Sequence, residues 1–170
     1  VAILSAFDPK KDSIIFDVGH QAYAYKILTG RNAKFSTLRT YKGISGFPSR
    51  DESICDPFTT GHSSASISSA LGISVANDLK RDNAHTVAII GDGSLTGGLA
   101  FEGLNNAGRL KKNFIVILND NEMAISKNEG AMAKYLSAIR STDKYFKVKG
   151  TVKKAVLSVP KVGQPLNDFI

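Results

Sequence analysis

Two short, almost uninterrupted apolar runs constrain the fold of this chain more than any other feature. They lie in the stretches HTVAIIG (85–91) and NFIVILND (113–120), and each ends abruptly in glycine or polar residues. Strands that are apolar on both faces are typical of parallel sheets covered by helices. The segment between them, GGLAFEGLNNAGRL (97–110), is long enough for the helix that a parallel connection requires. The sequence therefore predicts an α/β fold with an open, mostly parallel sheet and helices on both faces.

The rest of the chain continues this alternation up to about residue 140. SIIFDV (13–18) predicts a third buried strand, and SSASISSALGISVANDLK (63–80) predicts a helix rich in small residues. We expect further helical segments at the N-terminus, at 20–30, where Gly30 closes the helix, and at 34–39. Residues 41–58 hold two glycines, two prolines and scattered charges, which predicts a long loop. Such a loop either covers a site or lies on the surface.

Composition narrows the classes of function. The single cysteine, Cys55, excludes an internal disulfide framework and fits a reducing, cytoplasmic location. No apolar run is long enough to cross a membrane, and the first residues lack the pattern of a signal peptide. The net charge of +7 favours polyanionic partners, but the basic residues concentrate in 134–154, as on a solvated helix face. We therefore expect no nucleic-acid or membrane partner, and a polyanion-binding module stays an alternative.

Polar side chains follow the two apolar strands where each strand ends. Asp92 stands between two glycines directly after the first strand, and Asn121 closes the polar turn after the second. Ligands of open α/β sheets bind beyond the carboxyl ends of the strands. Glycines let a backbone approach a phosphate, but a carboxylate among them would repel a diphosphate unless a cation lay between. The oxygens of Asp92 and Asn121 suit Mg²⁺, which commonly bridges protein groups to phosphates.

Other interpretations of these residues stay open at this point. GDGSLTG (91–97) also fits Gly-x-Gly-x-x-x-Gly, a relative of the dinucleotide fingerprint, with Asp120 as a ribose-binding acid. Asp92 could instead cap a helix after a tight turn. His20 could be a helix cap or a packed core histidine, and His62 precedes a helix that Ser63 or Ser64 could cap. We favour the metal site, because an acid inside the glycine loop disfavours direct contact with a pyrophosphate.

Five longer stretches carry a resemblance to a known family. They are DVGHQAYAYKILTGR (17–31), GISGFPSRDES (43–53), TGHSSASISSALG (60–72), GDGSLTGGLAFEGLNNAG (91–108) and ILNDNEMAIS (117–126). Together they resemble the 1-deoxy-D-xylulose-5-phosphate synthases, thiamine diphosphate-dependent transferases with a transketolase-like fold. The resemblance runs through most of the chain, and it is more specific than the Gly-Asp-Gly motif alone.

The resemblance implies a role for each matching position. Mg²⁺ would be held by Asp92, Asn121 and the main-chain carbonyl of Met123. His20 would lie near the reactive end of thiamine diphosphate and act in proton transfer or substrate contact. Further cofactor contacts are implied for Gly61, His62, Ser63, Gly93, Ser94 and Asn121.

The resemblance also implies a reaction and partners. The family condenses pyruvate with D-glyceraldehyde 3-phosphate to 1-deoxy-D-xylulose 5-phosphate and CO₂, for isoprenoid, thiamine and pyridoxal synthesis, and its members are homodimers. Residues 1–140 would be the domain that binds the diphosphate and Mg²⁺, and 141–170 a basic, partly helical extension toward a pyrimidine-binding domain that this chain lacks. We therefore expect the chain to be a piece of a longer protein and inactive alone. Another thiamine diphosphate enzyme, such as a transketolase, is the main alternative.

Overall fold

A computed structural model describes residues 1–120, together with Tyr135 and Ala138. The chain divides into two units, Val1–Lys127 and Asn128–Ile170, and the architecture that follows belongs to the first. The predicted boundary at residue 140 stays a prediction. Two of the predicted magnesium ligands, Asn121 and Met123, lie outside the described residues, as does nearly all of the basic segment.

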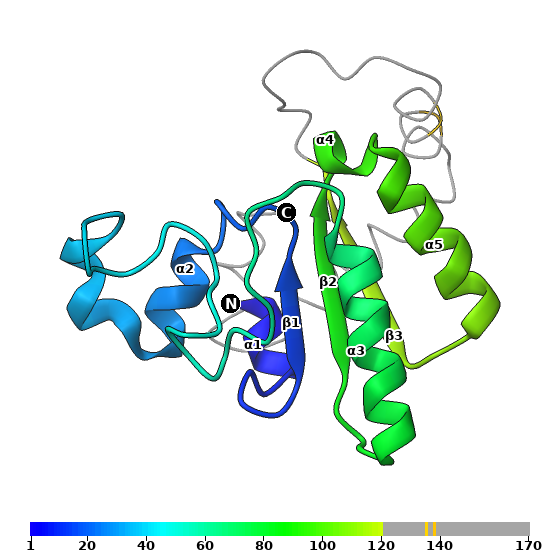
Figure 1. Cartoon of the computed structure of the whole chain (residues 1–170), viewed down its shortest axis with the longest axis horizontal. Helices are drawn as coiled ribbons and strands as arrows, with labels where there is room; N and C mark the ends of the chain where they lie inside the picture. Colours follow the sequence, from blue (N-terminus) through cyan, green and yellow to red (C-terminus); the bar gives the residue numbers. More distant parts are fainter. Residues whose placement is uncertain (121–134, 136–137, 139–170) are drawn as a thin grey trace, which may run out of the picture. The chain divides into compact units, whose positions relative to one another are not determined.

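The centre of the first unit is an open sheet of three parallel strands (Figure 1). These are β1 (Ser13–Phe16), β2 (Thr86–Gly91) and β3 (Phe114–Asn119), in the spatial order β1-β2-β3. The register places Ile15 opposite Ala88, and Ile89 opposite Ile117. Each strand coincides with one of the apolar runs, whose β-branched residues fit a pleated, buried surface. The predicted α/β class and parallel sheet are therefore confirmed.

One helix precedes β1, and the other helical segments lie in the connections between the strands. They are α1 (Ala2–Ala6), α2 (Tyr23–Lys26), the π-helical turn η1 (Ile27–Arg31), the 3₁₀ segment η2 (Asn32–Thr37), α3 (Ser66–Lys80), α4 (Asp92–Leu95) and α5 (Gly98–Leu110). Within the part of the chain that the structure describes, no helix is both long and apolar enough to span a membrane.

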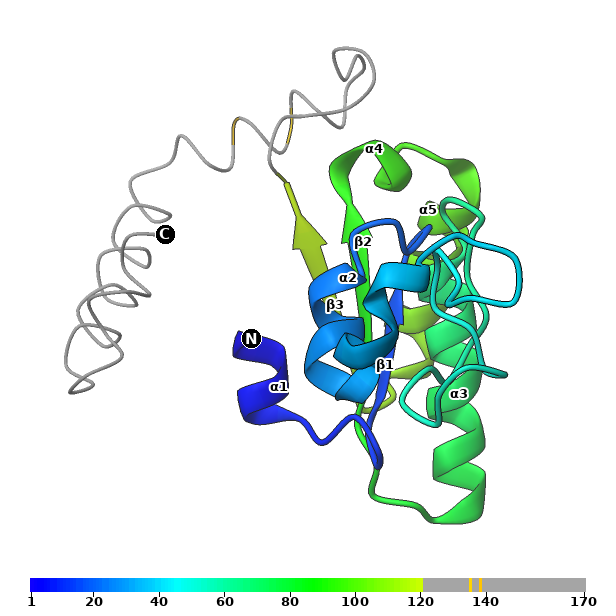
Figure 2. The same ribbon diagram turned by 90° about the vertical axis from the view of Figure 1, so that its left-hand side faces the viewer.

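Different helices cover the two faces of the sheet (Figure 2). On one face, Phe16 of β1 and Ile89 of β2 pack in a cluster with Ala22 and Tyr25, which residues of α1 extend. On the other face, α3 contacts all three strands and packs against α5. The connections from β1 to β2 and from β2 to β3 advance in the same direction, so right-handed crossovers place α3 and α5 on one side.

Some predicted elements differ from the observed ones. The segment predicted as one helix over 20–30 begins only at Tyr23 and ends in a π-helical turn, where Gly30 has a φ of +94°. The helix predicted from residue 63 begins at Ser66, for a reason that lies in the site. The short helix α4 was not predicted, because four residues hold no periodic pattern. The loop over 41–58 is confirmed as free of helices and strands.

Candidate functional site

The carboxyl ends of the strands meet at one edge of the sheet, as the sequence predicted. Gly91 at the end of β2 lies opposite Asn119 at the end of β3, so Asp92 and Asp120 follow at neighbouring positions. Asp92 is 9% exposed and is the first residue of α4. Gly91, with extended backbone, is the N-cap residue of that helix, so the interpretation of Asp92 as its cap is wrong.

A buried aspartate that sequence reasoning missed organises this edge. Asp17 directly follows β1 and is 2% exposed. Its carboxylate oxygens accept hydrogen bonds from the backbone N–H of Ser64 at 2.8 Å and of Ser66 at 3.0 Å. Asp17 therefore does what a capping side chain does at a helix start, and it explains why α3 begins at Ser66. The expectation that Ser63 or Ser64 caps α3 is wrong, since no side chain at its N-cap position does so.

The turn before α3 contacts the turn after β2. The hydroxyl of Ser64 donates a 2.7 Å hydrogen bond to the carbonyl oxygen of Ser94. Gly97 makes this close approach possible, because a Cβ there would lie only 2.1 Å from Ser64 Oγ. The structure therefore brings two groups of predicted cofactor contacts together. These groups are Gly61, His62 and Ser63 on one turn, and Gly93 and Ser94 on the other.

His20 lies on a third turn, which contacts the same region. The preceding residue, Gly19, has a φ of +95°, and a Cβ there would lie 2.5 Å from Pro48 Cδ and 2.5 Å from Thr60 Oγ1. Thr60 leads directly into Gly61, so the turns that carry His20 and His62 are neighbours. Both imidazoles are exposed to solvent. The interpretation of His20 as a core histidine is wrong, and so is its interpretation as a helix cap, because α2 has Ala22 as its N-cap residue.

Two open glycine backbones and the carboxylate of Asp92 make this edge suitable for a diphosphate held through a cation. A Cβ on Gly61 or Gly91 would meet nothing within 4 Å, which leaves both backbones open to an incoming group. Asp92 supplies the carboxylate oxygen that Mg²⁺ prefers. Among the residues that the structure describes, no three His, Cys, Asp or Glu side chains cluster as a metal site. The predicted magnesium site therefore depends on Asn121 and Met123, and it stays a prediction.

Other polar residues named by the sequence lie away from these turns. His85 is exposed beside Asp12 at the opposite ends of the strands, as its interpretation as a surface residue predicted. Cys55 is buried and unpaired, and its carbonyl oxygen accepts a hydrogen bond from the Tyr25 hydroxyl, which fits a structural role.

The fold and this edge define a class of protein. The fold of this chain is similar to part of the transketolase from Leishmania mexicana, with a TM-score of 0.61 and 25% sequence identity. That match covers 76% of this chain and 23% of the transketolase chain. The chain thus has a transketolase-like α/β fold.

Sequence comparison places the chain within one family of this class. The family model described as 1-deoxy-D-xylulose-5-phosphate synthase matches residues 1–170, and the chain belongs to that family. It is 55% identical over 163 residues to the 1-deoxy-D-xylulose-5-phosphate synthase of Carboxydothermus hydrogenoformans, and 57% identical over 166 residues to that of Nitratidesulfovibrio vulgaris strain DP4. These matches cover 96% and 98% of this chain, but the chain spans only 26% of the length of either relative.

Proposed function

We propose that this chain is the diphosphate-binding part of a 1-deoxy-D-xylulose-5-phosphate synthase. The observation that carries the proposal is the contact between two turns, fixed by the bond from Ser64 to Ser94, at the strand end that presents Asp92. The family relationship supports the same function, because the chain matches the synthase model over its whole length. The substrates would be pyruvate and D-glyceraldehyde 3-phosphate.

Each turn at the edge has a proposed task. Asp92, with Asn121 and the carbonyl of Met123, would hold Mg²⁺ against the diphosphate of thiamine diphosphate. Gly93 and Ser94 on one turn would contact the diphosphate, together with the Gly61, His62 and Ser63 turn. When bound, thiamine diphosphate supplies the carbanion chemistry that decarboxylation and carbon–carbon bond formation require.

His20 is the proposed proton-transfer residue of this part of the protein. An imidazole exchanges protons near neutral pH, and the exposed ring of His20 leaves it accessible to a substrate. It lies on a turn that packs against the turn preceding His62, so the two turns that carry the imidazoles are neighbours. The proposal also includes a homodimer, a pyrimidine-binding domain outside this chain and a cytoplasmic location.

The experiment that tests the proposal is a chimera. This chain replaces the matching segment of the Carboxydothermus hydrogenoformans synthase, and the chimera receives pyruvate, D-glyceraldehyde 3-phosphate, Mg²⁺ and thiamine diphosphate. We expect release of CO₂ and formation of 1-deoxy-D-xylulose 5-phosphate, and no turnover by the 170-residue chain alone. Substituting Asp92→Ala should lower magnesium-dependent cofactor affinity by at least about a hundredfold. Loss of a residue that only orients a metal ligand costs up to about a hundredfold, and Asp92 would be a ligand itself.

The matched control is Asp12→Ala, which removes another buried carboxylate from the opposite edge of the sheet. Its chimera should fold and keep the cofactor affinity. Ketol transfer from a ketose phosphate without use of pyruvate would instead identify a transketolase-type activity. Binding of polyanions that weakens steeply with salt and ignores Asp92→Ala would replace the proposal with a polyanion-binding module.

A further inference from the structure

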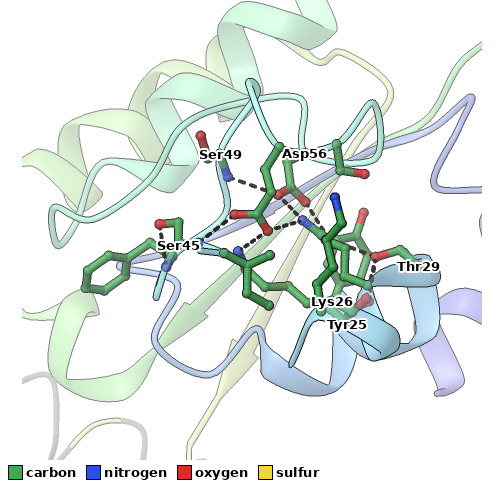
Figure 3. A network of polar contacts seen from close by, with 12 residues as sticks. Tyr25, Lys26, Thr29, Ser45, Ser49 and Asp56 are labelled. Carbon is green, nitrogen blue, oxygen red and sulfur yellow. Dashed lines mark hydrogen bonds and ion pairs between the residues drawn. The ribbon is translucent and has the colours of Figure 1, made fainter. Parts of the chain in front are cut away.

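A cluster of buried charges joins α2 and its π-helical turn to the long loop (Figure 3). Lys26 Nζ lies 2.6 Å from Glu52 Oε1, and Arg31 Nη1 lies 3.1 Å from the same oxygen. The Arg31 guanidinium also binds Asp56 in a bidentate arrangement, with Nη2 3.0 Å from Oδ1 and Nη1 2.5 Å from Oδ2. The side chains of Lys26 and Asp56 are fully buried, and that of Arg31 is 7% exposed.

The charges of this cluster stabilise one another. Burial alone would raise the pKa of Glu52, but hydrogen bonds from Lys26 and the Ser45 amide, with the charges of Lys26 and Arg31, hold that pKa below its usual value. Burial would lower the pKa of Arg31, and its bonds to Asp56 and Glu52 raise it instead. Removing one partner would therefore leave an uncompensated buried charge.

The two carboxylates also fix the backbone of the loop. Glu52 Oε2 accepts a hydrogen bond from the Ser45 amide at 2.7 Å, and Asp56 Oδ2 accepts one from the Ser49 amide at 2.9 Å. Pro48, which lies between these two amides, is buried. The hydrogen bond from the Ser49 amide to Asp56 thus links Pro48, the preceding residue, to the charge cluster.

Pro48 contacts both turns that carry the histidines of the candidate site. Its carbonyl oxygen accepts a 3.1 Å hydrogen bond from the Thr60 amide, directly before Gly61. Its ring lies against the Cα of Gly19, directly before His20, so closely that a Cβ on Gly19 would be 2.5 Å from Pro48 Cδ. Pro48 therefore contacts both turns, and a shift of Pro48 would displace both of them.

We propose that Arg31 and Asp56 are positioning residues of the candidate site. Their ion pair holds Ser49 and Pro48 in place, and Pro48 in turn fixes the turn of His20 and the turn of Gly61. Buried ion pairs add little net stability compared with apolar residues of the same volume. Holding the loop in place is therefore a better explanation of the Arg31–Asp56 pair than added stability. The chemical consequence rests on the proposed function of the two turns, but the mechanical coupling does not.

Amide hydrogen exchange in the 170-residue chain tests the coupling. In Asp56→Ala, exchange should accelerate about ten- to a hundredfold in peptides covering 17–23 and 59–65, the effect of losing a charged hydrogen-bond acceptor. Asp56→Asn keeps an oxygen for the Ser49 amide, so it should restore part of the protection. Asp12→Asn is the matched control, because Asp12 is also buried and accepts backbone amides, from Asp8 at 2.9 Å and His85 at 2.8 Å, at the opposite edge.

Two results would overturn the proposal. One is equal acceleration by Asp12→Asn and Asp56→Asn in the two turns, which would mean general destabilisation. The other is unchanged protection of the turns in Asp56→Ala. If Asp56→Ala does not fold, Arg31→Lys takes its place, since it keeps the charge but loses the bidentate geometry; the same two turns should then lose protection, and unchanged turns would again overturn the proposal.

The chimeric synthase separates this proposal from the proposed function. Asp56→Asn should raise the KM for thiamine diphosphate and lower kcat relative to Asp12→Asn at matched stability. Loss of protection in the turns, combined with an inactive parent chimera, would refute the proposed function and leave the positioning role standing. Unchanged kinetic constants in an active chimera would show that the two turns need no positioning, and would overturn the role in the site.

Discussion

At each of the two edges of the sheet, a buried aspartate accepts hydrogen bonds from backbone amides, but the surroundings of the two aspartates differ. At the amino ends of the strands, buried Asp12 accepts backbone amides from Asp8 and His85. At the carboxyl ends, buried Asp17 accepts backbone amides from Ser64 and Ser66. In both places an aspartate side chain that is almost completely buried accepts N–H donors, as buried polar groups require.

The edges differ in what surrounds the carboxylate. Around Asp12 two segments meet, the turn from Asp8 to Asp12 and the residues just before β2, and the pKa of Asp12, which burial alone would raise, is held low by hydrogen bonds from the His85 and Asp8 amides. Around Asp17, turns from three parts of the sequence converge, and they leave His20 and His62 exposed. A carboxylate that accepts backbone amides is thus common to both edges, and the convergence of glycine-containing turns is what distinguishes the carboxyl edge as the candidate site.

The largest effect should come from breaking that convergence with Gly19→Ala. The new Cβ would lie 2.5 Å from Pro48 Cδ and Thr60 Oγ1, on a backbone with a φ of +95°. Strain and overpacking together should lower the free energy of unfolding by about 3 kcal/mol, measured by urea unfolding. Gly30→Ala is the control, since Gly30 has a φ of +94° but open space around it, and it should lose only about 1 kcal/mol. Equal losses would show that the close approach at Gly19 is unimportant.

The next largest effect should come from replacing each of the two buried aspartates, Asp17 and Asp12. Asp17→Ala and Asp12→Ala each leave two backbone amides without a buried acceptor, so each should lower the free energy of unfolding by about 2 kcal/mol. Only Asp17→Ala should also weaken thiamine diphosphate binding to the chimeric synthase, measured by calorimetry. Loss of binding in both variants would mean that affinity follows stability and that the two edges do not differ in function.

The loss of stability in acid should differ between variants of the charge cluster and variants of the amino edge. The folded-state pKa of Glu52 lies below its ordinary value of 4.5, so the unfolded chain binds more protons as the pH falls. The stability that Glu52 contributes is therefore complete above pH 4.5 and is lost as the pH falls toward the folded-state pKa. Urea unfolding between pH 3 and 7 should show a flatter acid limb for Glu52→Gln. Asp12→Asn should flatten the limb only below about 3.8, the ordinary value for Asp12. An unchanged acid limb in Glu52→Gln would contradict this assignment.

The sheet and one part of the site could be predicted because their signals are local. The apolar runs that contain Val87 and Ile117 alternate with segments of helical pattern along the chain. Such runs indicate buried strands directly. The place of Asp92 at the carboxyl edge could be predicted from position alone, because it follows a strand that ends in glycine; its role as a magnesium ligand stays a prediction. The class of fold and the edge that carries the candidate site follow from these patterns together with the rule for parallel sheets.

The residues that assemble the site gave no local signal. Asp17 binds the amide of Ser64, which is 47 residues away in the sequence, and nothing near Asp17 predicts that partner. Lys26 and Arg31 stand in a helical segment, where charged residues are usually solvated, yet both are buried against acids 21 to 26 residues further on. Long-range pairing of this kind depends on how the loop folds back, which the periodicity of a sequence does not contain.

The smallest effect should come from the exposed ion pair at the amino edge. Lys112, before β3, pairs with Asp78 in α3, and the Asp78 side chain is 58% exposed. Water screens such a pair, and holding two long side chains together costs entropy, so Lys112→Ala should change the free energy of unfolding by at most about 0.5 kcal/mol. Urea unfolding in low and high salt measures the loss, which should shrink as salt increases. A loss above about 2 kcal/mol that persists in salt would show that this pair is shielded from water as the buried carboxylates are, and would contradict the prediction.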